Sequence, residues 1–192
     1  MFSSLTKIFF LYFFISQAIA NEIPIDVNQP HAGHSLEGSA SYLEDKSKAL
    51  LFPEDILVHD GWLPLNRNNS QIGLSSSDYW LKFNLVNSSN SNKSIYFVHE
   101  LAFLDDLEIY WRNSDGTQFQ KVSGLEPYEM RHVDMPLPTV QLTMHAGESI
   151  TVFARFSNQH IEHTSLNLNL WSDEKLAVFK NKAMFVLTVV EH

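Results

Sequence analysis

The sequence predicts an all-β protein built as an antiparallel β-sandwich. Three observations support this prediction: apolar and polar residues alternate with a period of two in several short segments, turn-forming residues separate the segments, and helical periodicity is nearly absent before residue 172. About seven to nine short strands at this spacing are typical of two packed antiparallel sheets. We expect them to form a single domain over Ala40–Asp173.

Residues 1–20 are predicted to be a signal peptide that lies outside the fold. Lys7 supplies a positive charge, Ile8–Ile15 forms an apolar core, and Ala18–Ala20 ends in a small-x-small cleavage pattern. The protein is therefore expected to be exported, to a periplasm or to the outer face of the cytoplasmic membrane.

Charge and cysteine content exclude several functions. Without Lys7, 12 basic residues stand against 22 acidic ones, a net charge of about −10, which argues against nucleic acid as a partner. The chain has no cysteine, so thiol chemistry is excluded and the fold must depend on its hydrophobic core. An exported protein of this kind suits a bacterial periplasm.

Residues 21–39 are predicted to be a loosely ordered leader. The segment is polar, and Pro24, Pro30, Gly33 and Gly38 interrupt any regular element. It holds two histidines, His31 and His34, but a closed metal site needs further ligands that this segment lacks. We therefore predict no metal and no cofactor.

The segment Ser41–Leu57 is expected to begin with an extended piece at Tyr42-Leu43 and to continue into a helical turn opened by Pro53. It carries four carboxylates that could be taken for a catalytic pair. Adjacent acids in loops are usually solvated, and no spacing here places two of them across a cleft. We interpret these carboxylates, Glu44, Asp45, Glu54 and Asp55, as surface groups.

The clearest strand runs from Tyr79 to Val86. Its odd-numbered residues are apolar and are expected to face the core, whereas Trp80, Lys82 and Asn84 are expected to face outward. An indole, an ammonium and an amide on one face can stack on and hydrogen-bond a sugar or a similar polar ring. The alternative is that Trp80 packs under a loop or a second layer, as such residues more often do.

Further strands follow in order after the polar turn Asn87–Ser94. Leu107–Arg112 and Thr117–Val122 flank strong turn residues and are predicted to form a hairpin, with Tyr110 and Arg112 on its outward face. Beyond an irregular segment with three prolines, Gly124–Pro138, the alternation returns. The other predicted strands are Ile95–Val98, Val140–Met144, Ser149–Phe156 and a last one through Leu166–Leu170. The predicted core residues are Leu81, Phe83, Leu85, Ile109, Leu142, Leu166 and Leu168.

The tail, residues 174–192, is apolar and compatible with a helix. Lys180 and Lys182 leave only Ala183–Val190 uninterrupted, which is well below the ~20 residues of a membrane helix. Two interpretations stay open: the truncated start of a membrane helix, or an ordinary terminal helix.

The order of the motifs over roughly Ala40–Asp173 resembles a known family, the second type of extracellular sensor domain in bacterial seven-transmembrane receptors with diverse intracellular signalling modules. The matching residues are Tyr42-Leu43-Glu44-Asp45, Gly73, Tyr79-Trp80-Leu81-Lys82, Leu107-Glu108-Ile109-Tyr110, Asp115-Gly116, Arg131 and Leu170-Trp171. Such domains usually show Arg where this chain has Lys82, and Lys cannot make a bidentate contact.

The resemblance implies a jelly-roll sandwich similar to carbohydrate-binding modules, outside the cytoplasmic membrane and followed by seven membrane helices and a cytoplasmic output domain. The function that it implies is a sensor in signal transduction. Contact with the membrane would then be made through a missing C-terminal region, and the oligomeric state is left open.

Three classes of function differ in the side chains that they require. The first is a sensor that binds a carbohydrate or another small polar ligand through aromatic and cationic side chains, namely Trp80, Lys82, Tyr110, Arg112, Arg131 and His132. The structural alternative is that Arg131 anchors its Pro-rich loop and that Tyr110 and Arg112 are solvated hairpin surface.

The second function is a glycan-active enzyme, which is disfavoured because no nucleophile, base and orienting group can be assembled from the scattered histidines and carboxylates. The third is a protein-interaction module, which exposed aromatic residues would serve equally well. A cleft beside Trp80 and Tyr110 would favour a small ligand, whereas a flat apolar patch would favour a protein.

Overall fold

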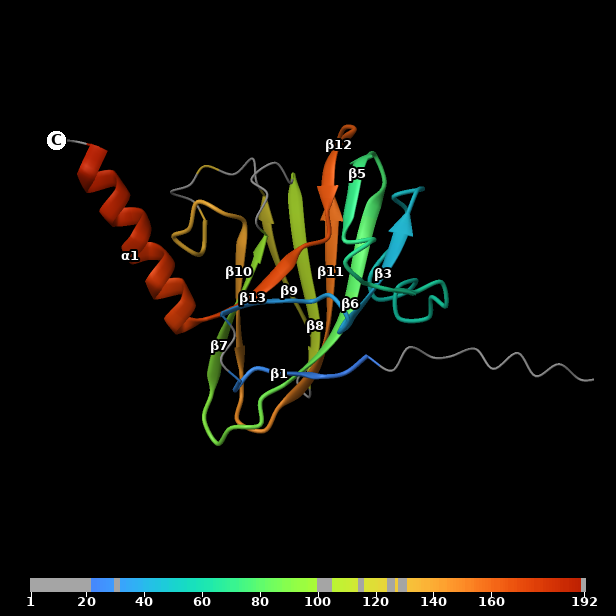
Figure 1. The fold of residues 1–192 in the computed structure, drawn as a ribbon. Helices are drawn as coiled ribbons and strands as arrows, with labels where there is room; N and C mark the ends of the chain where they lie inside the picture. The colour runs from blue at the N-terminus through green and yellow to red at the C-terminus, as the bar shows by residue number, and fades with distance from the viewer. Residues whose placement is uncertain are drawn as a thin grey trace, which may run out of the picture.

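A computed structural model of the chain describes residues 22–29, 32–99, 105–113, 116–123, 127 and 131–190. The predicted signal peptide, residues 1–20, lies outside the described residues, as do Ser114 and Asp115 in the hairpin turn. The described chain forms two packed β-sheets, a two-stranded ribbon and one C-terminal helix (Figure 1).

The larger sheet has seven strands in this part of the chain. Its order is β4 (Leu63–Pro64), β3 (Ala40–Asp45), β6 (Asp78–Val86), β11 (Ser149–Ser157), β8 (Asp106–Asn113) and β9 (Gly116–Ser123), and β1 (Ile25–Asp26) pairs with the end of β6 in parallel. All its other pairings are antiparallel, which confirms the predicted β-sandwich and the predicted hairpin of β8 and β9.

The smaller sheet has the order β10 (Thr139–Met144), β7 (Lys93–His99), β13 (Leu168–Ser172) and β2 (Ala32–Ser35). The ribbon joins β5 (Gln71–Ser75) to β12 (Glu162–Ser165). The tight hairpin of β8 and β9 is local in sequence, whereas β11 lies between β6 and β8 in the larger sheet and β13 lies between β7 and β2 in the smaller one.

The core lies between the two sheets. All seven residues predicted to fill it are at most 2% exposed. Phe83 of β6 meets Phe97 of β7 edge to face, with ring centroids 5.9 Å apart, so the two sheets contact through aromatic rings as well as aliphatic side chains. The inward faces assigned to β6, β8 and β13 are thereby confirmed.

The prediction of a loosely ordered leader is wrong. The segment contains β1 and β2, and Ile25, Val27 and Leu36 are buried in the main core. The sequence could not indicate this, because strands of two and four residues are too short to show a period, and their order comes from pairing with β6 and β13. His31 and the side chain of His34 lie outside the described residues.

The helix α1 (Asp173–Val190) begins where β13 ends. The Ser172 hydroxyl accepts the backbone N–H of Lys175 at 3.3 Å, and Asp173 and Glu174 follow in the first turn, where carboxylates favour a helix N-terminus. Leu176 and Phe179 pack on the outer face of the smaller sheet, against Trp171 and its neighbours. Trp171 points to the face of the sheet away from the main core, yet it is only 5% exposed because α1 covers it.

Beyond these contacts α1 leads away from the sandwich (Figure 1). In the described part of the chain, no helix has both the length and the apolar character needed to cross a membrane.

Candidate functional site

The outer face of the larger sheet carries four of the six residues predicted to bind ligand. In the registered pairs, Arg155 of β11 lies between Trp80 and Glu108, Phe153 lies between Lys82 and Tyr110, and Thr151 lies between Asn84 and Arg112. Sequence alternation placed Trp80, Lys82, Tyr110 and Arg112 on outward faces, and the sheet brings them onto one surface. β11 separates the first two from the last two.

Part of this outer face is covered by the segment 46–62, which we call the covering loop. Ile56 of the loop packs with Leu43, Trp80 and Phe153 in a second hydrophobic cluster, together with the partly buried side chains of Leu50, Phe52, Trp62 and Tyr110. Trp80 is 1% exposed. The expectation that Trp80 offers an open stacking surface is therefore wrong, and the alternative, a Trp packed under a loop, is what the structure shows.

Lys82 is largely occupied within the protein. Its ammonium lies 3.2 Å from the Glu22 carboxylate and 5.0 Å from the centroid of the Trp62 ring. The chain preceding β1 and the end of the covering loop thus share its charge, and 28% of its side chain is exposed. A contact between Lys82 and a ligand would have to compete with these two interactions.

Tyr110 lies at the edge of the covered part of the outer face. Its ring stacks on Phe52 at 4.6 Å and lies 4.7 Å from Phe119, and its hydroxyl donates to Glu108 Oε2 at 3.0 Å. Burial, and then the negative charge of Glu108, raises the pKa of Tyr110 well above its ordinary value. The hydroxyl is therefore a neutral donor that is already directed at a carboxylate.

A charged network lies beside Trp80 on the same face. Asp78 is fully buried and accepts Arg155 and the Ser157 hydroxyl, while Arg155 also reaches Glu108 at 3.2 Å. Burial alone would lower the pKa of Arg155, but its bonds to Asp78 and the charges of Asp78 and Glu108 raise it above the ordinary value. Because these charges satisfy one another, the network is suited to holding β6, β11 and β8 together.

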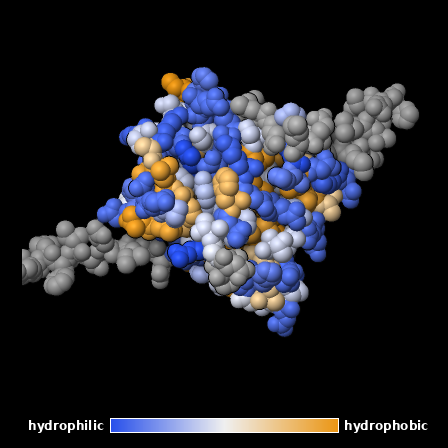
Figure 2. Space-filling view, turned by 180° about the vertical axis from the view of Figure 1, so that it is seen from behind, coloured by the Kyte–Doolittle hydropathy of each residue, from blue (hydrophilic) through white to orange (hydrophobic). Residues whose placement is uncertain are grey.

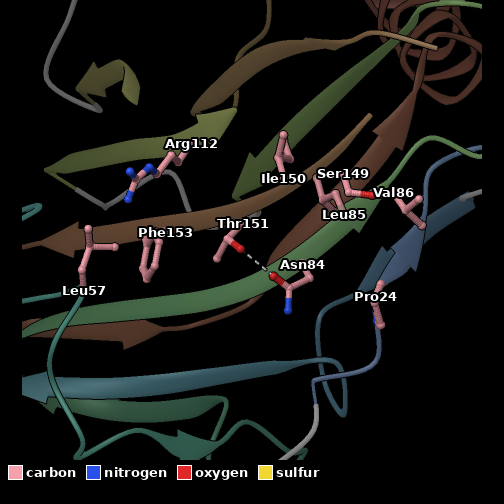
Figure 3. Close-up of a pocket in the computed structure, with 10 residues that line it drawn as sticks. All are labelled: Pro24, Leu57, Asn84, Leu85, Val86, Arg112, Ser149, Ile150, Thr151 and Phe153. Atoms are coloured by element: carbon pink, nitrogen blue, oxygen red, sulfur yellow. Dashed lines mark hydrogen bonds between the residues drawn. The ribbon is translucent and has the colours of Figure 1, made fainter. Parts of the chain in front are cut away.

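Beside the covering loop, the outer face contains a hollow of about 560 Å³, which we call the outer-face hollow (Figure 3). Polar side chains line its floor: Thr151 donates to Asn84 Oδ1 at 2.8 Å, and Asn84 in turn donates to Glu22 at 3.3 Å. Figure 3 shows Phe153 and Leu57 together at one end of the hollow and Pro24 at the other.

Arg112 supplies the positive charge of the outer-face hollow. Its side chain is exposed, and no ion pair joins it to any of the residues that the structure describes. A guanidinium offers several N–H donors in a fixed plane, which suits carboxylate, phosphate or vicinal hydroxyl groups. The hollow therefore combines a directional cation, an amide and hydroxyl pair, and an apolar wall.

Arg131 and His132 do not join this surface. They precede β10, where Arg131 Nη1 donates to the carbonyl oxygen of Pro136 at 2.9 Å and approaches that of Met135 at 3.4 Å. This geometry matches the structural alternative, in which Arg131 anchors its Pro-rich loop. His132 is exposed and lines a second hollow of about 710 Å³ between β9 and β10, which we call the edge hollow, with Trp111, Gln118, Gln120, Gln141 and Thr143.

Sequence reasoning missed Thr151, Phe153 and Leu57 as parts of a site. Alternation along Ser149–Phe156 could have grouped Thr151 with Phe153, but nothing local shows that this strand pairs between β6 and β8. Leu57 belongs to the covering loop, whose position depends on tertiary packing alone.

Comparison with known proteins identifies one matching protein family. The family model described as 7TMR-DISM extracellular 2 matches residues 37–172, which begins before β3 and ends with β13. No curated protein matches this chain. The matched range contains all four outer-face residues and both residues before β10.

Proposed function

Because this chain belongs to the 7TMR-DISM extracellular 2 family, whose members are extracellular sensor domains of seven-transmembrane receptors, and is thus an exported sensor module, we propose that it binds a small polar ligand in the outer-face hollow. The family is one of receptor sensors rather than of enzymes. A carbohydrate, and in particular one with an acidic group, is the ligand class that the lining residues suit best.

The observation that carries this proposal is the exposed Arg112 guanidinium beside the Asn84–Thr151 pair. An acidic sugar would place its carboxylate on Arg112 and its hydroxyl groups on the amide and the threonine. The Phe153 and Leu57 side chains would contact the apolar face of the ring. Since Trp80 is covered, binding by indole stacking is not part of the proposal.

The test is a thermal-shift screen of neutral sugars, acidic sugars and small carboxylates, followed by calorimetry on the wild type, Arg112→Ala and Arg67→Ala. Arg67 is an exposed arginine in the turn between β4 and β5, away from the hollow, so it serves as the matched control. We expect Arg112→Ala to weaken binding by at least about tenfold, the loss of one charged hydrogen bond, and Arg67→Ala to leave it unchanged.

A ligand that binds Arg112→Ala as tightly as the wild type would contradict the proposal. In that case Gln141→Ala would show whether the ligand occupies the edge hollow instead, where three glutamines and His132 gather.

The alternative is a protein-interaction module. Leu51, Leu57 and Val58 of the covering loop are 61%, 42% and 80% exposed, which could serve a protein partner. However, Figure 2 shows apolar surface divided by polar surface rather than one continuous patch on the face that it presents. A concave hollow with convergent polar groups favours a small ligand over a flat protein interface.

A further inference from the structure

A second group of chemically active side chains lies at the other end of the larger sheet. Asp105 directly precedes β8, and His160 and Glu162 lie on the turn from β11 into β12 and at the start of β12. One ligand atom from each of the three side chains lies within 4.8 Å of the other two. More than 50 positions separate Asp105 from the other two in sequence, so only the fold brings them together.

This cluster carries negative charge that the described protein does not neutralise. Asp105 is 7% exposed and accepts the backbone N–H of Gln159 at 2.6 Å, a neutral donor. No ion pair joins Asp105 or Glu162 to another side chain within the described ranges. Two carboxylates held this close repel each other, and a cation between them would relieve that repulsion.

We propose that Asp105, His160 and Glu162 bind a divalent transition-metal ion, with Zn²⁺ as the best match. One imidazole nitrogen and two carboxylate oxygens form a mixed ligand set that borderline metals accept, whereas Ca²⁺ takes oxygen ligands and Mg²⁺ keeps most of its water. Two carboxylates also match the charge of a dication. Water would complete a tetrahedral shell, as in zinc sites with three protein ligands.

The geometry permits this coordination. Zinc ligands lie about 2.0–2.2 Å from the ion, so the ligand atoms must approach one another more closely than 4.8 Å. His160 is exposed and Glu162 is partly exposed, so both side chains have room to rotate toward the buried Asp105. Asp105 is already fixed in place by Gln159, and its backbone carbonyl accepts the Ser123 hydroxyl at 2.8 Å.

Such an ion would fix the turn after β11 to the start of β8. In the sheet register Ser157 pairs with Asp106 at this end, whereas Thr151 pairs with Arg112 at the outer-face hollow. The two ends are six residues apart along β11, about 20 Å at the rise of a strand. The metal site is therefore separate from the proposed ligand site and can be tested without any ligand.

The experiment uses tag-free protein treated with a chelator and then dialysed. Thermal unfolding and titration calorimetry are carried out with ZnCl₂, and with CaCl₂ and MgCl₂ as comparison ions. We expect Zn²⁺ to bind at one ion per chain and to raise the melting temperature, because an ion that binds only the folded state stabilises it. Calcium and magnesium are expected to produce a much smaller shift.

The decisive variants are His160→Ala and Glu162→Gln, with His163→Ala as the matched control. His163 is an exposed histidine next to Glu162 on β12, where successive side chains point to opposite faces. We expect the first two variants to weaken Zn²⁺ binding by at least about tenfold and His163→Ala to retain wild-type affinity. Equal loss in His160→Ala and His163→Ala would identify adventitious binding to surface histidines and overturn the proposal.

Melting curves in the presence of chelator show whether each variant folds. If His160→Ala does not fold, Glu162→Gln still tests the site, because glutamine has nearly the same size as glutamate and can form hydrogen bonds. The absence of any saturable Zn²⁺ binding, or equally tight binding of Ca²⁺, would also overturn the assignment.

Discussion

Arg155 on β11 makes two hydrogen bonds to one carboxylate oxygen of Asp78 on β6, from Nη2 at 2.6 Å and from Nε at 3.0 Å. The Asp78 side chain is fully buried, and its other oxygen accepts the Ser157 hydroxyl at 3.0 Å. This pair links the two central strands of the larger sheet. It also lies next to Trp80, whose ring centroid is 5.7 Å from the Arg155 guanidinium carbon.

Asp78→Asn is expected to lower the free energy of unfolding by about 3 kcal/mol, because the change leaves a partly buried guanidinium without its principal counter-charge. Urea denaturation measures the change. The control is Lys46→Gln, which removes an ion pair to Glu44 whose lysine is 80% exposed, and we expect it to cost less than about 1 kcal/mol. Equal losses of unfolding free energy in the two variants would show that the burial of Asp78 does not increase the contribution of its ion pair to stability.

Trp80→Ala and Phe83→Ala are both expected to cost about 3–5 kcal/mol, since the two side chains are 1% and 0% exposed on opposite faces of β6. Alternation alone predicts a cost below about 1 kcal/mol for Trp80, so denaturation of the two variants separates the two views. In the described structure nothing accepts a hydrogen bond from the buried Trp80 Nε1. Trp80→Phe should therefore retain much more of the stability than Trp80→Ala.

Leu176→Ala is expected to cost about 2–3 kcal/mol, because Leu176 is 9% exposed and packs with Tyr96, Val98 and Met135. Val178→Ala, two residues further along α1 and 50% exposed, should change stability by less than about 0.5 kcal/mol. If α1 does not pack on the sandwich, both substitutions will leave the melting temperature unchanged. The truncated-helix interpretation predicts that unchanged melting temperature. The packing of α1 on the smaller sheet predicts that Leu176→Ala lowers it and Val178→Ala does not.

The stability of the protein should fall as the pH rises from about 10 to about 12, partly through Tyr96. Burial, followed by its hydrogen bond to Asp173 at 2.8 Å, raises the pKa of Tyr96 from 10.0 to about 12. The folded state therefore holds the Tyr96 proton more tightly than the unfolded state does. Its contribution to the free energy of unfolding is complete below pH 10 and is lost as the pH approaches 12. Tyr96→Phe removes this titration and should flatten the pH dependence of the unfolding free energy over that range.

Tyr79 and Tyr110 also have raised pKa values, so the wild-type slope includes all three tyrosines. The difference between wild type and Tyr96→Phe isolates the contribution of Tyr96. An identical slope for both proteins would show that Tyr96 is not protected in the folded state.

The fold class and the inward faces of the strands could be predicted from the amino-acid sequence alone. Alternation is a local property, so Phe83, Leu85 and Ile109 could be assigned to the core without knowledge of any partner strand. The ordered motifs were also sufficient to indicate the family that matches residues 37–172. It was right that Trp80, Lys82, Tyr110 and Arg112 face away from that core.

The segments that cover the outward faces could not be predicted, because their positions depend on tertiary packing. The covering loop buries Trp80 and leaves Arg112 exposed, although both residues occupy outward-facing positions in their strands. The position of β11 between β6 and β8 places Thr151 beside Arg112, and the turn after β11 places His160 near Asp105. These neighbours are set by long-range strand pairing and by packing between layers. Contacts of this kind join residues far apart in the chain, so they produce no periodic pattern in the local sequence from which they could be predicted.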